Sequence, residues 1–258
     1  IMAGTIGKNK EVDIKIGQGL LDVDSILDES GNYRWEGYVI QEIEGELYIA
    51  GSDRRGTVYG IYEFSRWLGV SPWYYFGDVP VKRKQEIIVS CGFYKADYPS
   101  VQYRGIFIND EEELEAWAEE HTKDKTIGPE IYEKIFELLL RLKANYIWPA
   151  MHVNYFNENL RNGELADEMG IVVGTSHCDM LLRSNQNEWN PWVLKKGYHE
   201  LKYDYSIEGE NRERIKEYWR ESLEQNRNYE NTYTIGMRGI HDSGFVASKI
   251  DGNTELSE

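Results

Sequence analysis

The chain has 258 residues, of which 41% are apolar and 29% are charged, so its composition is that of a folded globular protein rather than a disordered one. The formal net charge of -16 excludes a general positive field for binding nucleic acid or anionic membrane surfaces. The 19 tyrosines and 8 tryptophans suit either stacking on sugar rings or packing of an aromatic core.

Motifs for a metal or a nucleotide cofactor are missing from the sequence, and we expect neither. Cys91 and Cys178 lie far apart, which argues against a disulfide framework. No CxxC, HExxH, GxGxxG or P-loop pattern occurs, and no signal peptide or transmembrane run is visible. Because the chain opens without methionine on a predicted strand, we expect it to be a segment of a longer protein.

Residues 1–97 predict a small N-terminal α/β domain. Short runs rich in β-branched residues predict four strands, over Ile1–Ile6, Tyr38–Ile43, Glu46–Ala50 and Glu86–Cys91. Gly45 between the middle two indicates a hairpin. Apolar residues at helical spacing predict a helix over Gly56–Leu68, which Gly69 ends.

Residues 98–258 alternate between strand and helix patterns. Pro99 marks the boundary, since the residue before a proline resists helix. Predicted strands cover Val101–Ile108, Asn145–Ala150, Gly170–Thr175 and Thr232–Met237. Predicted helices cover Gly128–Lys143, Asn159–Met169 and Gly209–Gln225.

This alternation favours parallel strands joined by right-handed crossovers. Either an open sheet or the start of a (β/α)8 barrel would fit. A complete barrel takes about 250 residues. If the fold is a barrel, residues 98–258 therefore hold about four βα units, the N-terminal half of it.

Polar or titratable side chains follow each of these four strands. The residues concerned are Asn109 and Asp110, then His152 after a strand that runs through Trp148, then His177, and finally Arg238, His241 and Asp242. In parallel α/β folds the carboxyl ends of the strands carry the chemistry. The sequence therefore predicts one site built from these residues.

Structural explanations compete with this interpretation at several positions. Asp110, followed by Glu111, Glu112 and Glu113, also fits a solvated acidic helix start. Trp148 fits packing inside a barrel wall as well as sugar stacking. Asp242 fits an ion pair with Arg238, since a buried guanidinium needs a partner.

Aromatic residues, carboxylates and an arginine together suit hydrolysis of a glycoside. That reaction needs one carboxylic acid to protonate the leaving oxygen and a second carboxylate as base or nucleophile. The planar fork of an arginine would select a sugar that carries a carboxylate.

Several long runs resemble glycoside hydrolase family 115, the α-glucuronidases that remove glucuronic acid or its 4-O-methyl form from xylan. They span nearly the whole chain in the family's order: GSDRRGTVYGIYEFSRWLGVSPWYYFGDVPV, YRGIFINDE, FELLLRLKANYIWPAMH, LADEMGIVVGTSHCDM, YDYS and YTIGMRGIHDSG. The resemblance implies a small N-terminal α/β domain, residues 1–97, followed by the first half of a (β/α)8 catalytic barrel, residues 98–258.

The resemblance also implies roles for individual residues. Asp242 falls on an essential acid of the MRGIHD motif, and Arg238 falls on the arginine that we assign to the uronate carboxylate. Asn109 and Asp110 match positions that touch sugar hydroxyls. Further substrate-binding positions are expected at Trp148, His177, His152 and His241. The second catalytic carboxylate is expected past Glu258.

The expected activity is therefore removal of α-1,2-linked glucuronic acid or 4-O-methylglucuronic acid from xylan by an inverting acid/base mechanism, without metal or cofactor. Residues 1–258 alone are expected to be inactive. The expected partners are glucuronoxylan and its oligosaccharides, and family resemblance favours a secreted or periplasmic protein. The oligomeric state stays open, with a homodimer as one option. A hexosaminidase-like barrel glycosidase and a non-catalytic carbohydrate-binding protein remain alternatives.

Overall fold

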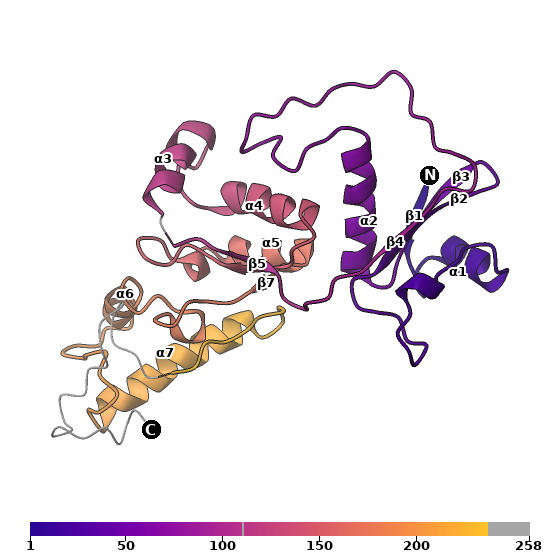
Figure 1. The fold of residues 1–258 in the computed structure, drawn as a ribbon. Helices are drawn as coiled ribbons and strands as arrows, with labels where there is room; N and C mark the ends of the chain where they lie inside the picture. Colours follow the sequence, from indigo (N-terminus) through magenta and orange to yellow (C-terminus); the bar gives the residue numbers. More distant parts are fainter. Residues whose placement is uncertain (110, 237–258) are drawn as a thin grey trace. The chain divides into compact units, whose positions relative to one another are not determined.

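The structure of the chain is a computed structural model that describes residues 1–109 and 111–236 (Figure 1). These residues form two compact units. One holds residues 1–104 and 137–145, and the other holds residues 105–136 and those from 146 onward. Both units combine helices with strands, so the predicted α/β class is confirmed. Within the described residues, no helix has the length and apolar character needed to cross a membrane.

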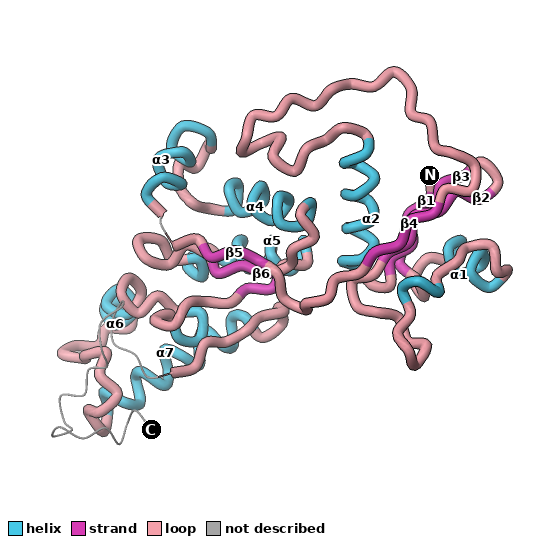
Figure 2. Tube along the Cα trace, in the orientation of Figure 1, coloured by secondary structure: helices cyan, strands magenta, loops and turns pink. Residues whose placement is uncertain are grey.

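The first unit is built on a four-stranded sheet in the order β1-β3-β2-β4 (Figure 2). The strands are β1 (Met2–Thr5), β2 (Tyr38–Ile43), β3 (Glu46–Gly51) and β4 (Tyr94–Asp97). β1 is parallel to β3, and the other neighbours are antiparallel. The β2–β3 hairpin predicted at Gly45 is confirmed, and its φ of 88° suits a glycine.

Helices cover both faces of this sheet (Figure 1). They are α1 (Lys10–Gly17) and α2 (Arg54–Trp67), and a single 3-10 turn, η1 (Asp24–Ile26), follows α1. Successive residues of a strand face opposite sides. Accordingly, Tyr48 and Ala50 pack in one apolar cluster with Val12 of α1. Ile49 faces α2, where a Cβ on Gly60 would lie 2.6 Å from its Cγ2.

The strand predicted over Glu86–Cys91 is wrong. The segment between α2 and β4 contains no strand (Figure 2), and Ile88 within it is 82% exposed. The strand that completes the sheet is β4, which pairs with β2 from Tyr38↔Asp97 to Gln41↔Tyr94. The β-branched composition of residues 86–91 therefore does not decide where the strand forms. Antiparallel pairing with β2 decides it, and residues 94–97 provide that pairing.

A buried carboxylate on α2 makes the stability of this unit dependent on pH. Glu63 is 3% exposed and accepts hydrogen bonds from Lys95 Nζ at 2.6 Å and Arg66 Nη2 at 2.7 Å. Burial by itself would raise its pKa, but these hydrogen bonds and the charge of Lys143 hold the pKa at about 2. The stabilisation is therefore present above the ordinary glutamate pKa and is lost as the pH falls toward 2.

We expect acidification from pH 5 toward pH 2 to remove roughly 1–3 kcal/mol of unfolding free energy through Glu63. Urea unfolding at a series of pH values measures this loss. Glu63→Gln should flatten the pH dependence in that range, whereas the exposed Glu29→Gln should leave it as in the wild type. Equal slopes for Glu63→Gln and wild type would contradict the assignment.

The second unit contains a parallel sheet in the order β5-β6-β7. The strands are short: β5 (Gly105–Phe107), β6 (Tyr146–Trp148) and β7 (Val172–Val173). Gly105 permits the close approach of the first two, because a Cβ there would lie 1.8 Å from the carbonyl oxygen of Tyr146. The parallel pairing predicted for these three strands is confirmed, although each is shorter than predicted.

Helices occupy the connections between these strands. Between β5 and β6 lie α3 (Glu112–His121) and α4 (Pro129–Arg141), and between β6 and β7 lie η2 (Phe156–Glu158) and α5 (Leu160–Met169). After β7 come η3 (Met180–Leu182), α6 (Trp189–Lys195) and α7 (Glu210–Asn226). α6 and α7 share an aromatic core that includes Trp189, Trp192 and Tyr218.

The strand predicted over Thr232–Met237 is wrong for its described part, because residues 232–236 form no strand. A single parallel bridge pairs Asn231 with Val173, and the amide of Thr232 donates to the carbonyl of Val173 at 2.9 Å. The segment therefore begins beside β7 without continuing as a ladder. The sequence interpretation also missed α1 and α6, and it gave the start of α3 only as an alternative explanation for the acidic run at residues 110–113.

Candidate functional site

A cavity of about 280 Å³ lies among the loops that follow β5, β6 and β7. Its lining consists of Phe107, Ile108, Asn109, Glu111, Met151, His152, Ser176, His177, Cys178, Asp179 and Gln186. The carboxyl ends of three parallel strands meet at one edge of the sheet, which brings these loops together. The volume is just below the range of about 300–1,000 Å³ that is typical of small-molecule sites, so it suits a small ligand.

Three predicted site residues line this cavity together: Asn109, His152 and His177. They come from three different strand ends, as the sequence predicts. Among the described residues, Trp148 is not one of those that line this cavity. Its indole N–H donates to the Tyr146 hydroxyl at 2.9 Å, and its ring packs edge-on against Phe107 at 5.3 Å. Packing therefore accounts for the contacts of Trp148.

The other predicted site residues lie outside the described residues. They are Asp110, Arg238, His241 and Asp242. Their roles, like those of the three cavity residues, stay predictions.

Glu111 is a cavity residue that the sequence interpretation treated as part of a solvated helix start. For Glu111 that interpretation is wrong, because the residue is 0% exposed. Its carboxylate accepts hydrogen bonds from the turn after β6. Its neighbours Glu112 and Glu113 are exposed, in agreement with the original interpretation. Adjacent glutamates thus have opposite environments.

Asp179 is a second carboxyl that the sequence interpretation missed. It is 8% exposed and accepts a hydrogen bond from the Ser176 hydroxyl at 2.9 Å. Burial raises its pKa to about 6, and the charges of Glu188 and Glu111 add to the increase. Hydrogen bonds from Ser176 and Cys178 oppose the shift. The carboxyl therefore changes charge near neutral pH.

The described lining thus offers groups that can exchange protons or bind hydroxyls. Asn109 and Gln186 provide amides, His152 and His177 provide imidazoles, and Asp179 provides a carboxyl. Among the residues that the structure describes, no group of three or more His, Cys, Asp or Glu side chains could hold a metal ion. The sequence signal for Asp179 was its position two residues after His177.

Comparison with known protein families shows to which family this chain belongs. The sequence profile of glycosyl hydrolase family 115 matches residues 96–257. The chain belongs to glycosyl hydrolase family 115. The resemblance found in the sequence runs is thereby confirmed.

A solved structure from family 115 independently supports this family assignment. It is titled a novel family GH115 4-O-methyl-alpha-glucuronidase, BtGH115A, with specificity for decorated arabinogalactans. The identity is 36% and the TM-score 0.82, over 96% of this chain and 32% of that one. This family 115 chain therefore spans about a third of the length of that relative.

Two other structures are more distant. CpGH84D is 12% identical with a TM-score of 0.43, over 88% of this chain and 32% of that one. CpGH84B is 15% identical with a TM-score of 0.45, over 84% of this chain and 31% of that one. These likenesses are too low to support any conclusion about the family 115 chain. No curated protein sequence matches it.

Proposed function

We propose that this chain is part of an enzyme that removes α-1,2-linked glucuronic acid or 4-O-methylglucuronic acid from xylan. One observation carries the proposal: at 36% identity, nearly the whole chain matches a structure whose title names a 4-O-methyl-alpha-glucuronidase. The small, partly polar cavity at the strand ends supports it, because it suits a small ligand.

The proposal includes the first half of a (β/α)8 barrel over residues 98–258, preceded by a domain over residues 1–97. The parallel order β5-β6-β7 supports it, as does the bridge that brings Asn231 beside Val173. Barrel enzymes place their chemistry at the carboxyl ends of the strands. The cavity with Asn109, His152 and His177 lies at that end.

The proposed mechanism is inverting. Two carboxyl groups would stand roughly 6.5–9.5 Å apart, one to protonate the leaving oxygen and one to activate water. Asp242 would supply one of them, and Arg238 with His177 would bind the uronate carboxylate. Asn109 and Asp110 would contact sugar hydroxyls. Residues 1–258 by themselves are proposed to release no uronic acid.

A product assay on the longer protein tests the proposal. Wild-type enzyme should release glucuronic acid from glucuronoxylan, with an anomer of inverted configuration seen first by NMR. Decorated arabinogalactan serves as the second substrate, because the solved relative is titled for it. Release from arabinogalactan alone would correct the polymer, and release of N-acetylhexosamine would favour a hexosaminidase. Binding without release would favour a carbohydrate-binding protein.

Asp179 should make uronate binding dependent on pH. Below its pKa of about 6 the carboxyl is neutral, and above that value it places a negative charge in the cavity. A like charge within about 4–6 Å opposes an anionic ligand. We expect the Kd for D-glucuronate to rise roughly tenfold as the pH passes upward through this pKa.

Calorimetric titration at pH 5 and pH 7.5 measures this change. Asp179→Asn should bind with little pH dependence over the same interval, and a neutral ligand, glucuronamide, should show little in the wild type. A rise in Kd that persists in Asp179→Asn would assign the effect to another group.

The proposal also covers the substrates, the location and the oligomeric state of the longer protein. Glucuronoxylan and its oligosaccharides are the proposed partners. A secreted or periplasmic location is proposed from family resemblance, and a homodimer of the longer protein is one option for the oligomeric state. Gel filtration coupled to light scattering would determine the oligomeric state.

A further inference from the structure

The carboxylate of Glu111 is held by four hydrogen bonds from one turn. The backbone amide of His152 donates to Oε1 at 2.5 Å. The amides of Val153 and Asn154 donate to Oε2 at 3.0 Å each, and the Asn154 side-chain amide donates to Oε2 at 2.7 Å. The side chain is fully buried, so these donors replace the water that an exposed carboxylate would bind.

The backbone of Glu111 has a separate role. It lies at the N-cap of α3, and its carbonyl accepts the amide of Glu115 at 2.7 Å. The residue follows the loop that carries Asn109 after β5. One residue therefore starts a helix with its backbone and fixes the turn after β6 with its side chain.

The turn that Glu111 holds forms part of two cavities. Met151 and His152 line the cavity of about 280 Å³ at the strand ends, together with Glu111 itself. Val153 and Asn154 line a larger neighbouring cavity of about 770 Å³. A shift of this turn would therefore change both cavities at once.

The four donors use both oxygens of the Glu111 carboxylate as acceptors. Three consecutive backbone amides pointing at one carboxylate form a small anion-binding nest. A glutamine in its place would keep one oxygen acceptor for the three donors that now reach Oε2, but its NH2 group would then face the His152 amide. Leaving buried donors unsatisfied is costly, so the turn would rearrange rather than keep this geometry.

We propose that Glu111 is a positioning residue: its buried carboxylate orders the 152–154 turn and thereby the cavity wall that carries His152. The inference rests on the proposed function for the meaning of the cavity, but the ordering of the turn is independent of it. Glu111 acts through the turn, and the geometry gives it no separate role in bond cleavage.

Glu111→Gln in the longer protein tests this inference, with Glu112→Gln as the matched control because Glu112 is exposed and adjacent. The first readout is hydrogen exchange by mass spectrometry on peptides that cover residues 150–156. The second is kcat and KM for uronic acid release, measured at a temperature at which all variants are folded.

In Glu111→Gln we expect amide exchange to accelerate at residues 152–154 and kcat/KM to fall on the order of 10–100-fold. Glu112→Gln should match the wild type in both. Unchanged exchange in Glu111→Gln would overturn the inference whatever the kinetics. Faster exchange with kcat/KM within twofold of the control would also overturn it, since the turn would then be structural only.

A milder variant covers the case in which Glu111→Gln does not fold. Asn154→Ala removes only the side-chain amide bond and leaves the three backbone donors. It should accelerate exchange in the same peptide and lower kcat/KM by a smaller factor, and no effect on either would overturn the inference. A wild type that releases no uronic acid would remove the proposed function, and hydrogen exchange would still decide the role of Glu111.

Discussion

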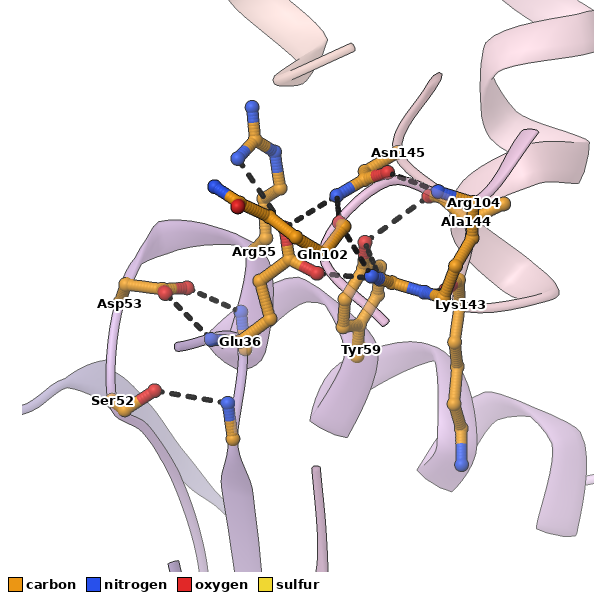
Figure 3. Close-up of polar contacts among 12 residues, drawn as sticks. Glu36, Ser52, Asp53, Arg55, Tyr59, Gln102, Arg104, Lys143, Ala144 and Asn145 are labelled. Atoms are coloured by element: carbon orange, nitrogen blue, oxygen red, sulfur yellow. Dashed lines mark hydrogen bonds and ion pairs between the residues drawn. The ribbon is translucent and has the colours of Figure 1, made fainter. Parts of the chain in front are cut away.

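Glu36→Gln is expected to lower the free energy of unfolding by about 3 kcal/mol. The carboxylate of Glu36 accepts hydrogen bonds from Arg104 Nη2 at 2.5 Å, Asn145 Nδ2 at 2.7 Å and Arg55 Nη1 at 3.3 Å (Figure 3). Its side chain is 4% exposed, and Asn145 is fully buried. Glu36→Gln removes the negative charge that two guanidinium groups share and replaces one acceptor oxygen with an NH2 group.

The size of the effect follows from the partial burial of the cations. Breaking a buried ion pair by removing one partner costs about 3–5 kcal/mol. The side chains of Arg104 and Arg55 keep 22% and 16% exposure, so water can replace part of the lost interaction. Glutamine also retains one oxygen acceptor. The lower end of the range is therefore expected.

The same network explains why segments far apart in the sequence stay together in the first unit. The backbone amide of Arg104 donates to Asn145 Oδ1 at 3.0 Å, and the backbone amide of Asn145 donates to the carbonyl oxygen of Arg104 at 2.8 Å. Glu36 joins this pair to the β2–β3 side of the unit, where its own amide donates to Asp53 at 2.7 Å. One carboxylate thus connects three stretches of chain.

Urea unfolding monitored by tryptophan fluorescence measures the change. Glu29→Gln, an exposed glutamate of the same unit, serves as the control and should shift the free energy by less than about 0.5 kcal/mol. A loss below about 1 kcal/mol for Glu36→Gln would show that the network contributes no more than a surface ion pair.

The sequence predicted the β2–β3 hairpin most accurately, because its two strands are adjacent in the chain. β2 and β3 form a hairpin, and their bounds match the prediction at all but one end. The fourth strand of the sheet, which pairs with β2 across about fifty residues, was placed wrongly. Glu86–Cys91 has the more strand-like composition, yet Tyr94–Asp97 has the register. Pairing at that distance is decided by packing, which composition does not encode.

Within the candidate site, position was predictable but burial was not. Asn109, His152 and His177 line one cavity because each follows a parallel strand, and strand ends can be read from the pattern. Glu111, Glu112 and Glu113 look alike in sequence. Glu111 differs from the other two because the turn after β6 points three backbone amides at its carboxylate. Such a nest depends on backbone geometry that a linear pattern does not show.

Asp242→Asn is expected to lower kcat for uronic acid release from glucuronoxylan by about 10²–10⁴-fold. The residue ends the MRGIHD motif, and in the proposed mechanism it would supply one of the two catalytic carboxyl groups. An inverting glycosidase has two carboxyl groups, and removal of either takes away one of the two assisted proton transfers. The variant should keep its thermal unfolding temperature and its Kd for D-glucuronate, because arginine rather than this acid would hold the uronate.

The leaving group then shows which half of the reaction Asp242 serves. A general acid protonates the departing oxygen, so its loss matters little when the leaving group is 4-nitrophenolate, which departs without a proton. A general base activates water, so its loss lowers the rate for every leaving group. A small decrease on 4-nitrophenyl α-D-glucuronide with a large one on xylan would assign the acid, and equal large decreases would assign the base.

Asp251→Asn, further along the chain and outside the motif, is the matched control and should retain wild-type rates on both substrates. If Asp242→Asn also retains them, Asp242 is not one of the two catalytic carboxyl groups. The acid would then have to be sought at another strand end. Asp110 and Asp179 would be the next candidates, because the first follows Asn109 directly and the second lines the cavity.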